Sequence, residues 1–195
     1  MAKKIISLFL FALCAGALLS ASAYAQEKPT APAEEKSNKP AKAEEHDWKN
    51  VFPDGLIKAG EKADKAKPDA VKTLKGKFVA VYNSASWCGP CRVFTPELVK
   101  FYKKNQKQME IIFKSADRTE DAMIAYAKKN KMKWLAIPFG KRCTTKAAGG
   151  IPHFVVYAPD GTLFAEISGS GEKSMKALNA LPEQMKEWQK KHKKR

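Results

Sequence analysis

The sequence is poor in cysteine, in acidic residues and in long apolar runs. Only 4 of its 195 residues are cysteines, too few for a small scaffold held together by disulfides. Its 20 acidic residues stand against 36 basic ones, a formal net charge of +16. Apart from one run near the N-terminus, no stretch is apolar enough to cross a membrane. The hydrophobic fraction of 44% still excludes disorder throughout, and the length suits one domain with appendages.

The one long apolar run covers residues 5–19. Two lysines precede it, and an Ala-Tyr-Ala triplet that ends at Ala25 follows it, with small residues at the two positions that a signal peptidase requires. We expect residues 1–25 to be a secretory signal peptide rather than a membrane anchor, which needs about 20 apolar residues. Cleavage would remove Cys14 and two of the 36 basic residues, so the net charge would fall from +16 to +14. The expected location is secreted or periplasmic, where disulfides persist.

Residues 26–46 are rich in proline, alanine, lysine and glutamate and have no large apolar side chain. Such a segment cannot bury a core, and we expect a disordered linker. The folded domain is expected to cover residues 47–195. Within it, residues 54–74 are rich in lysine and alanine, which predicts partial helix interrupted near Pro68.

Beyond residue 75 the pattern alternates between strands and helices. Apolar runs predict strands over residues 78–82, 110–114, 152–157 and 162–167. Helices are predicted from Cys88 to about residue 106, from Thr119 onward, and over the final segment, whose apolar side chains recur three or four residues apart. The turn signal Pro159-Asp160-Gly161 joins the last two strands as a hairpin. This order predicts an α/β domain whose central mixed sheet, a parallel pair plus an antiparallel hairpin, is flanked by helices.

The motif Trp87-Cys88-Gly89-Pro90-Cys91 stands between the first of these strands and its helix. Two cysteines three residues apart at a helix start lie on one face and can close a small ring. Cys88 would lie at the positive end of the helix dipole, which favours its thiolate, whereas Cys91 would be shielded one turn further in. Pro90 suits the first helical turn. The pattern therefore predicts thiol–disulfide exchange, with a redox-active Cys88–Cys91 disulfide and neither metal nor separate cofactor.

The cysteines allow two other interpretations. An inert Cys88–Cys91 bridge would close so small a loop that it would stabilise little. A zinc site could recruit Cys143 and His153 as further ligands, but these two residues lack the paired spacing of common zinc sites. The redox interpretation is favoured over both.

Three stretches carry a resemblance to the thioredoxin superfamily, and most of all to its tryparedoxin and nucleoredoxin branch. They are SASWCGPCRVFTPELVKFY (residues 84–102), WLAIPF (134–139) and GIPHFVVYAPDG (150–161), and the likeness extends over residues 75–168. The resemblance implies a thioredoxin fold with Cys88 as nucleophile and Cys91 as resolving thiol. It also implies that the Ile151-Pro152 peptide bond is cis and faces the cysteines. The substrate-binding residues that it implies are Trp87, Gly89, Pro90, Ile151 and Pro152.

The sequence departs from the family pattern in four places. Gly89-Pro90 is the thioredoxin pair, whereas tryparedoxins usually have two prolines there. Tyr82 stands where thioredoxin has a buried aspartate, so water or a neighbouring group must accept the proton of Cys91. Asp117 is one candidate, although an aspartate in that place more often caps the following helix. The connection over residues 140–149 is short, so the usual helix there is expected to be abbreviated.

Two further residues near the motif have open roles. Cys143 is expected to be a buried free thiol, a site of intermolecular pairing, or a third thiol brought close to Cys88 by the short connection. His153 follows the proline and is a candidate for tuning the Cys88 thiolate, although histidines in strands more often simply pack.

A basic C-terminal helix closes the sequence, with lysine or arginine at positions 186, 190, 191 and 193–195. Nucleic acid is not expected as a partner, because no recognition motif accompanies these residues. Weak attraction to an anionic membrane surface is the sharper alternative to a solvated helix end. The leading hypothesis is a secreted oxidoreductase that reduces protein disulfides and receives electrons from an upstream membrane or soluble thiol donor. The alternatives are a disulfide oxidase or isomerase and a non-catalytic binding module.

Overall fold

The structure, a computed structural model, describes residues 46–193. The expected signal peptide and nearly all of the expected linker lie outside the described residues, as do Lys194 and Arg195. Within residues 46–193, no helix is both long enough and apolar enough to cross a membrane.

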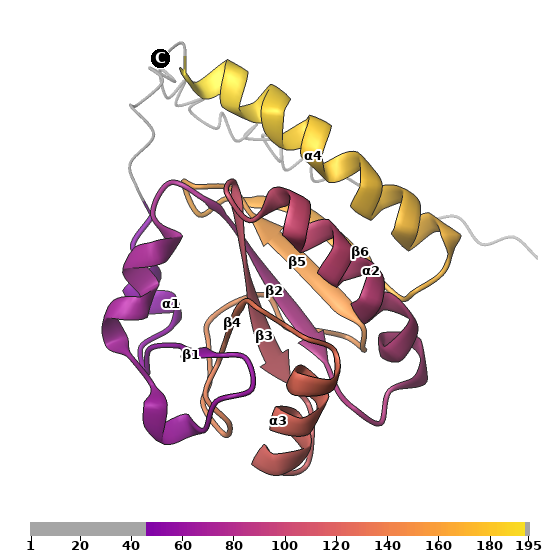
Figure 1. Cartoon of the computed structure of the whole chain (residues 1–195). Helices are drawn as coiled ribbons and strands as arrows, with labels where there is room; N and C mark the ends of the chain where they lie inside the picture. Colours follow the sequence, from indigo (N-terminus) through magenta and orange to yellow (C-terminus); the bar gives the residue numbers. More distant parts are fainter. Residues whose placement is uncertain (1–45, 194–195) are drawn as a thin grey trace, which may run out of the picture. The chain divides into compact units, whose positions relative to one another are not determined.

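A mixed sheet of six strands forms the centre of the domain, in the order β1-β4-β3-β2-β5-β6 (Figure 1). The strands are β1 (Ile57–Lys58), β2 (Phe78–Ser84), β3 (Met109–Ser115), β4 (Leu135–Ala136), β5 (His153–Tyr157) and β6 (Leu163–Ser168). Strand β2 pairs in parallel with β3 and antiparallel with β5, and β5 pairs antiparallel with β6. The predicted parallel pair and antiparallel hairpin are confirmed. The two short strands β1 and β4, which were not predicted, extend the sheet beyond β3.

The helices divide between the two faces of the sheet. They are α1 (Trp48–Val51), the 3-10 helices η1 (Ala63–Lys65) and η2 (Pro68–Leu74), α2 (Gly89–Asn105), α3 (Glu120–Lys129) and α4 (Glu172–Lys193). Helices α2, α3 and α4 bury their apolar side chains in one core cluster, which also receives Phe78, Ala80 and Tyr82 from β2. The intervening Val79 and Val81 point into a second cluster on the other face. This alternation follows from the two-residue period of a strand.

The second face has a thinner cover than predicted. Short α1, η2 and the chain after β4 pack there, and residues 137–152 contain no helix, in agreement with the expected abbreviation. The predicted partial helix with a break near Pro68 is confirmed, because η1 ends at Lys65 and η2 begins at Pro68. The missing N–H of Pro68 costs nothing at that position, since the first turn of a helix has no intrahelical acceptor for it.

The long C-terminal helix α4 packs along the first face beside α2 (Figure 1). Its predicted apolar stripe is confirmed: Leu178, Leu181 and Met185 are buried in the first cluster, and Met175 and Trp188 pack against it. The Trp188 ring contacts Phe78 with centroids 5.4 Å apart.

Candidate active site

Cys88 and Cys91 form a disulfide at the start of α2. Cys88 is the N-cap residue, and its sulfur accepts a hydrogen bond from the Cys91 N–H at 3.1 Å. Cys91 lies in the first turn and is fully buried, whereas Cys88 keeps 5% of its surface exposed. The greater shielding of Cys91 agrees with prediction, but Cys88 is itself less exposed than the pattern suggested.

The first turn of α2 is electrostatically favourable for a thiolate. It contains Gly89 and Pro90 and no acidic residue, so the partial positive charge of the helix terminus is not offset there. Cys88 also lies close to a carbonyl group, because its sulfur is 3.7 Å from the Ile151 oxygen. The helix terminus and the Cys91 N–H favour a negative sulfur at Cys88, and the Ile151 carbonyl shows where a second chain segment approaches it.

Ser86 and Asp117 hold the chain that leads into the cysteines. One Asp117 carboxylate oxygen accepts hydrogen bonds from the Ser86 N–H and hydroxyl, and the other accepts from the Ser115 hydroxyl. Asp117 does not cap α3, because the Thr119 hydroxyl does so by accepting from the Ala122 N–H. Asp117 thus braces the loop before Cys88 instead of capping α3, and its role as proton acceptor for Cys91 stays a prediction.

A groove of about 450 Å³ lies beside the disulfide. Its lining includes Trp87, Lys114, residues 147–150 and Ile151. The Trp87 side chain is 59% exposed, and its indole N–H donates to the Ala116 carbonyl at 3.3 Å, which fixes the ring at the rim. The Ile151-Pro152 peptide bond is cis, as the resemblance implied. Of the predicted substrate-binding residues, Trp87 and Ile151 line this groove, whereas Gly89, Pro90 and Pro152 are not part of its lining.

A cluster of buried hydroxyl groups lies behind Cys91. The Thr95 hydroxyl donates to the Cys91 carbonyl at 2.8 Å and lies 2.7 Å from the Tyr82 hydroxyl and 2.6 Å from the Tyr126 hydroxyl. The Tyr126 hydroxyl also lies 3.2 Å from that of Ser84. Burial raises the pKa of Tyr82 far above its ordinary value, and nearby Tyr126 adds to the effect. Tyr82 therefore stays neutral and does not replace the aspartate of thioredoxin as a base.

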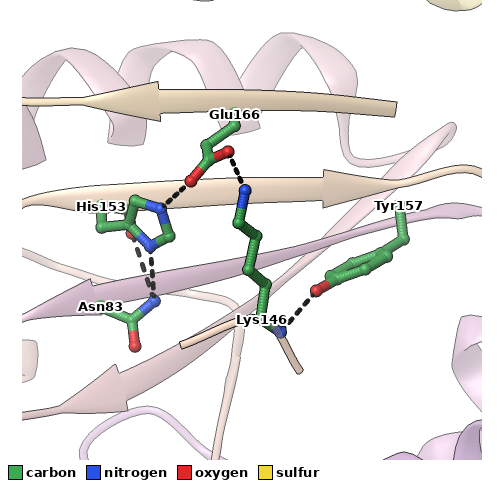
Figure 2. A network of polar contacts seen from close by, with 5 residues as sticks. All are labelled: Asn83, Lys146, His153, Tyr157 and Glu166. Carbon is green, nitrogen blue, oxygen red and sulfur yellow. Dashed lines mark hydrogen bonds and ion pairs between the residues drawn. The ribbon is translucent and has the colours of Figure 1, made fainter. Parts of the chain in front are cut away.

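His153 and Cys143 make separate sets of contacts. The buried His153 imidazole stands between Asn83 and Glu166 (Figure 2). Cys143 is a half-buried free thiol that packs against the second core cluster and lies 3.0 Å from the Thr145 hydroxyl. It is not part of the small cluster that Cys88 and Cys91 form with Ala85 and Ile151. The idea that the short connection brings Cys143 to Cys88 gains no support, and no group of three potential metal ligands occurs within residues 46–193.

Sequence reasoning missed the residues that act through side-chain hydrogen bonds. Thr95 lies four residues after Cys91, one helical turn further along the same face, and this spacing was the available signal. Nothing local marks Glu166 or Lys146, because each meets its partners only after the sheet has formed.

Comparisons with known proteins identify related chains. A family model described as thioredoxin-like matches residues 76–163. Tryparedoxin of Trypanosoma brucei brucei is 46% identical over 79 residues, which cover 40% of this chain and 54% of that protein. The structure of tryparedoxin I from Leishmania major has 37% sequence identity and a TM-score of 0.50, over 65% of this chain and 86% of that one. The chain belongs to the thioredoxin-like family.

Two further relatives of this thioredoxin-like protein show how far the likeness extends. Probable nucleoredoxin 1 of Arabidopsis thaliana is 40% identical over 99 residues, which are 47% of this chain but only 17% of that protein. The complex of tryparedoxin II with glutathionylspermidine has 31% identity and a TM-score of 0.52, and the match covers 70% of this chain and 91% of that one. The chain thus spans about half or less of the curated relatives that it matches.

Proposed function

We propose that the protein is a thiol–disulfide oxidoreductase that reduces disulfides of protein substrates through Cys88 and Cys91. The observation that carries the proposal is the Cys88–Cys91 disulfide at the N-terminus of α2, beside a groove lined by Trp87 and Ile151. Membership of the family supports the same chemistry. The complex of a relative with the thiol compound glutathionylspermidine supports a thiol or disulfide substrate.

The proposed reaction begins with the reduced protein. The Cys88 thiolate attacks one sulfur of the substrate disulfide, so that a mixed disulfide forms and the other substrate sulfur leaves as a thiolate. Cys91 then loses its proton, attacks the Cys88 sulfur and releases the second substrate thiolate, which closes the Cys88–Cys91 disulfide. Two electrons pass from the dithiol to the substrate. The substrate thiolates take up two protons, and an external thiol donor must reduce the disulfide again.

The roles of the surrounding groups follow from the contacts. The helix terminus and the Cys91 N–H stabilise the Cys88 thiolate, and Trp87 and Ile151 line the place where the substrate chain lies. No carboxylate among the described residues hydrogen-bonds to Cys91, and the Asp117 oxygens accept from Ser86 and Ser115. We therefore propose that water accepts the Cys91 proton once the disulfide has opened.

Insulin reduction with dithiothreitol as electron donor tests the catalytic proposal. The rate of insulin reduction with Cys88→Ser should fall to the rate with dithiothreitol alone, because the attacking sulfur is gone. Cys143→Ser is the matched control and should keep the wild-type rate, since Cys143 packs in a different cluster. Equal rates for wild type and Cys88→Ser would overturn the proposal and favour a non-catalytic binding module.

The direction of electron flow is a separate proposal, because an oxidase or isomerase would use the same two cysteines. Gly89-Pro90 is the thioredoxin pair and favours reduction. Equilibration with glutathione buffers should give a reduction potential near that of thioredoxin, about −270 mV. A value near −120 mV would instead assign an oxidant.

We also propose that the protein acts outside the cytoplasm after cleavage near Ala25, a proposal that rests on the sequence pattern alone. Mass spectrometry of the exported protein should find Gln26 at its N-terminus, and an intact N-terminus would contradict it.

The exposed Lys186, Lys190 and Lys191 on α4 support weak attraction to an anionic membrane. Cosedimentation with phosphatidylglycerol vesicles should weaken with added salt, and no binding at low salt would refute the attraction.

A further inference from the structure

Glu166 lies on the edge strand β6 and joins two segments that are distant from it in sequence. One of its carboxylate oxygens lies 2.7 Å from His153 Nε2, and the other contacts the Lys146 ammonium (Figure 2). The Lys146 and His153 hydrogen bonds lower the pKa of Glu166, in that order of importance, so it is ionised at neutral pH. A single carboxylate therefore contacts both the segment before Pro152 and the strand after it.

The His153 contact has a defined direction. The Asn83 side-chain amide lies 3.4 Å from His153 Nδ1 as a donor, and this leaves Nε2 to carry the proton that Glu166 accepts. Asn83 pairs with His153 across β2 and β5, and Glu166 pairs with Val155, two residues along. Diagonal neighbours on one face of a sheet lie within reach of long side chains. The start of β5 is thus held from both sides, next to Pro152.

The Lys146 contact acts on a segment that has no secondary structure to hold it. Residues 137–152 form neither helix nor strand. Lys146 is held twice, because its N–H donates to the Tyr157 hydroxyl at 2.8 Å and its ammonium binds Glu166 (Figure 2). Residues 147–151 follow directly and line the groove beside the disulfide, and the Ile151 carbonyl lies 3.7 Å from the Cys88 sulfur.

We propose that Glu166 is a positioning residue for the substrate-binding loop of residues 147–151. It touches neither cysteine, and it acts by holding Lys146 and His153 at the two ends of that loop. Without Glu166 the loop samples more conformations, and a protein substrate must order it on binding, which weakens binding rather than sulfur chemistry. The proposal rests on the proposed function, since it concerns the groove that the substrate disulfide would enter.

The test compares a large and a small disulfide on the same variants. For insulin, Glu166→Ala should raise KM by about tenfold, which corresponds to about 1.4 kcal/mol for ordering the loop on binding, and leave kcat nearly unchanged. Dithiobis(nitrobenzoate) is a small disulfide that does not need the loop. Its rate of reduction by Glu166→Ala should differ from the wild-type rate by less than about twofold. Glu166→Gln keeps an oxygen for His153 but loses the charge that binds Lys146. Its KM for insulin should therefore lie between those of the wild type and Glu166→Ala.

Controls separate positioning from general damage and from failure of the proposed function. Glu183→Ala removes an exposed ion pair with Lys186 on α4 and should leave both substrates unaffected. Lys146→Met removes only the ion pair with Glu166 and leaves the His153 contact, and it should also raise the KM for insulin. Unchanged KM in Glu166→Ala, or an equal loss on both disulfides, would overturn the positioning role while the proposed function stands. Inactivity of the wild type towards insulin would instead count against the proposed function.

Discussion

Replacing Thr95 with valine removes one hydroxyl group while nearly preserving the shape of the side chain. That hydroxyl is the common partner of Tyr82, Tyr126 and the Cys91 carbonyl, at 2.7, 2.6 and 2.8 Å. Tyr82 and Thr95 are fully buried, so water cannot take its place. Each buried hydroxyl without a partner costs roughly 1–3 kcal/mol. Because Tyr126 keeps Ser84, the loss falls mainly on Tyr82, and we expect Thr95→Val to lower the free energy of unfolding by about 3 kcal/mol.

Tyr82→Phe provides the matched comparison at the other end of the same hydrogen bond. It removes a hydroxyl but leaves Thr95 bonded to Tyr126, so the expected cost is about 1 kcal/mol. The double variant should cost less than the sum of the single ones, because no Tyr82 hydroxyl is then left without a partner. Urea unfolding of the oxidised protein, followed by circular dichroism, measures all three values. A Thr95→Val cost no larger than that of Tyr82→Phe, or strict additivity, would refute the reasoning.

Two further predictions concern Glu110 and Trp188. Burial raises the pKa of Glu110 above its ordinary 4.5, so its contribution to stability is present below that pH and is lost as the pH rises through the raised pKa. Glu110→Gln should therefore gain stability relative to wild type between about pH 4 and 7 in thermal unfolding, and a constant difference would contradict this. Trp188→Ala removes the ring that packs on Phe78 and should cost about 2–3 kcal/mol in urea unfolding, whereas unchanged stability would contradict the assigned packing of α4.

Most of the sheet could be predicted because its inner strands carry their own signal. The run from Phe78 to Tyr82 is apolar on both faces, and both faces of β2 are buried. Strands β1 and β4 have two residues each, and they exist because β3 offers β4 an open edge and β4 then offers one to β1. Two residues cannot show a period, so this part of the sheet had no detectable pattern.

The site divides in the same way between local and long-range features. The Cys88–Cys91 spacing and the start of α2 are local, and the structure places the two cysteines as the motif indicates. The roles of Asp117 and Glu166 depend on which strand ends meet in space. Asp117 is a residue type that often caps helices, but Thr119 directly precedes α3 and is its N-cap residue. Asp117 instead binds Ser86. Such assignments follow from tertiary contacts rather than from residue type.

Capture of a mixed disulfide is the most direct test of the central claim, that Cys88 is the attacking sulfur. Cys91→Ser cannot release the substrate, so incubation with a protein disulfide should leave a covalent complex. Dithiothreitol should cleave this complex by reducing the mixed disulfide. Peptide mapping by mass spectrometry should place the linkage at Cys88, and Cys88→Ser should form no such complex. A linkage at Cys143, or no complex with Cys91→Ser, would contradict the account.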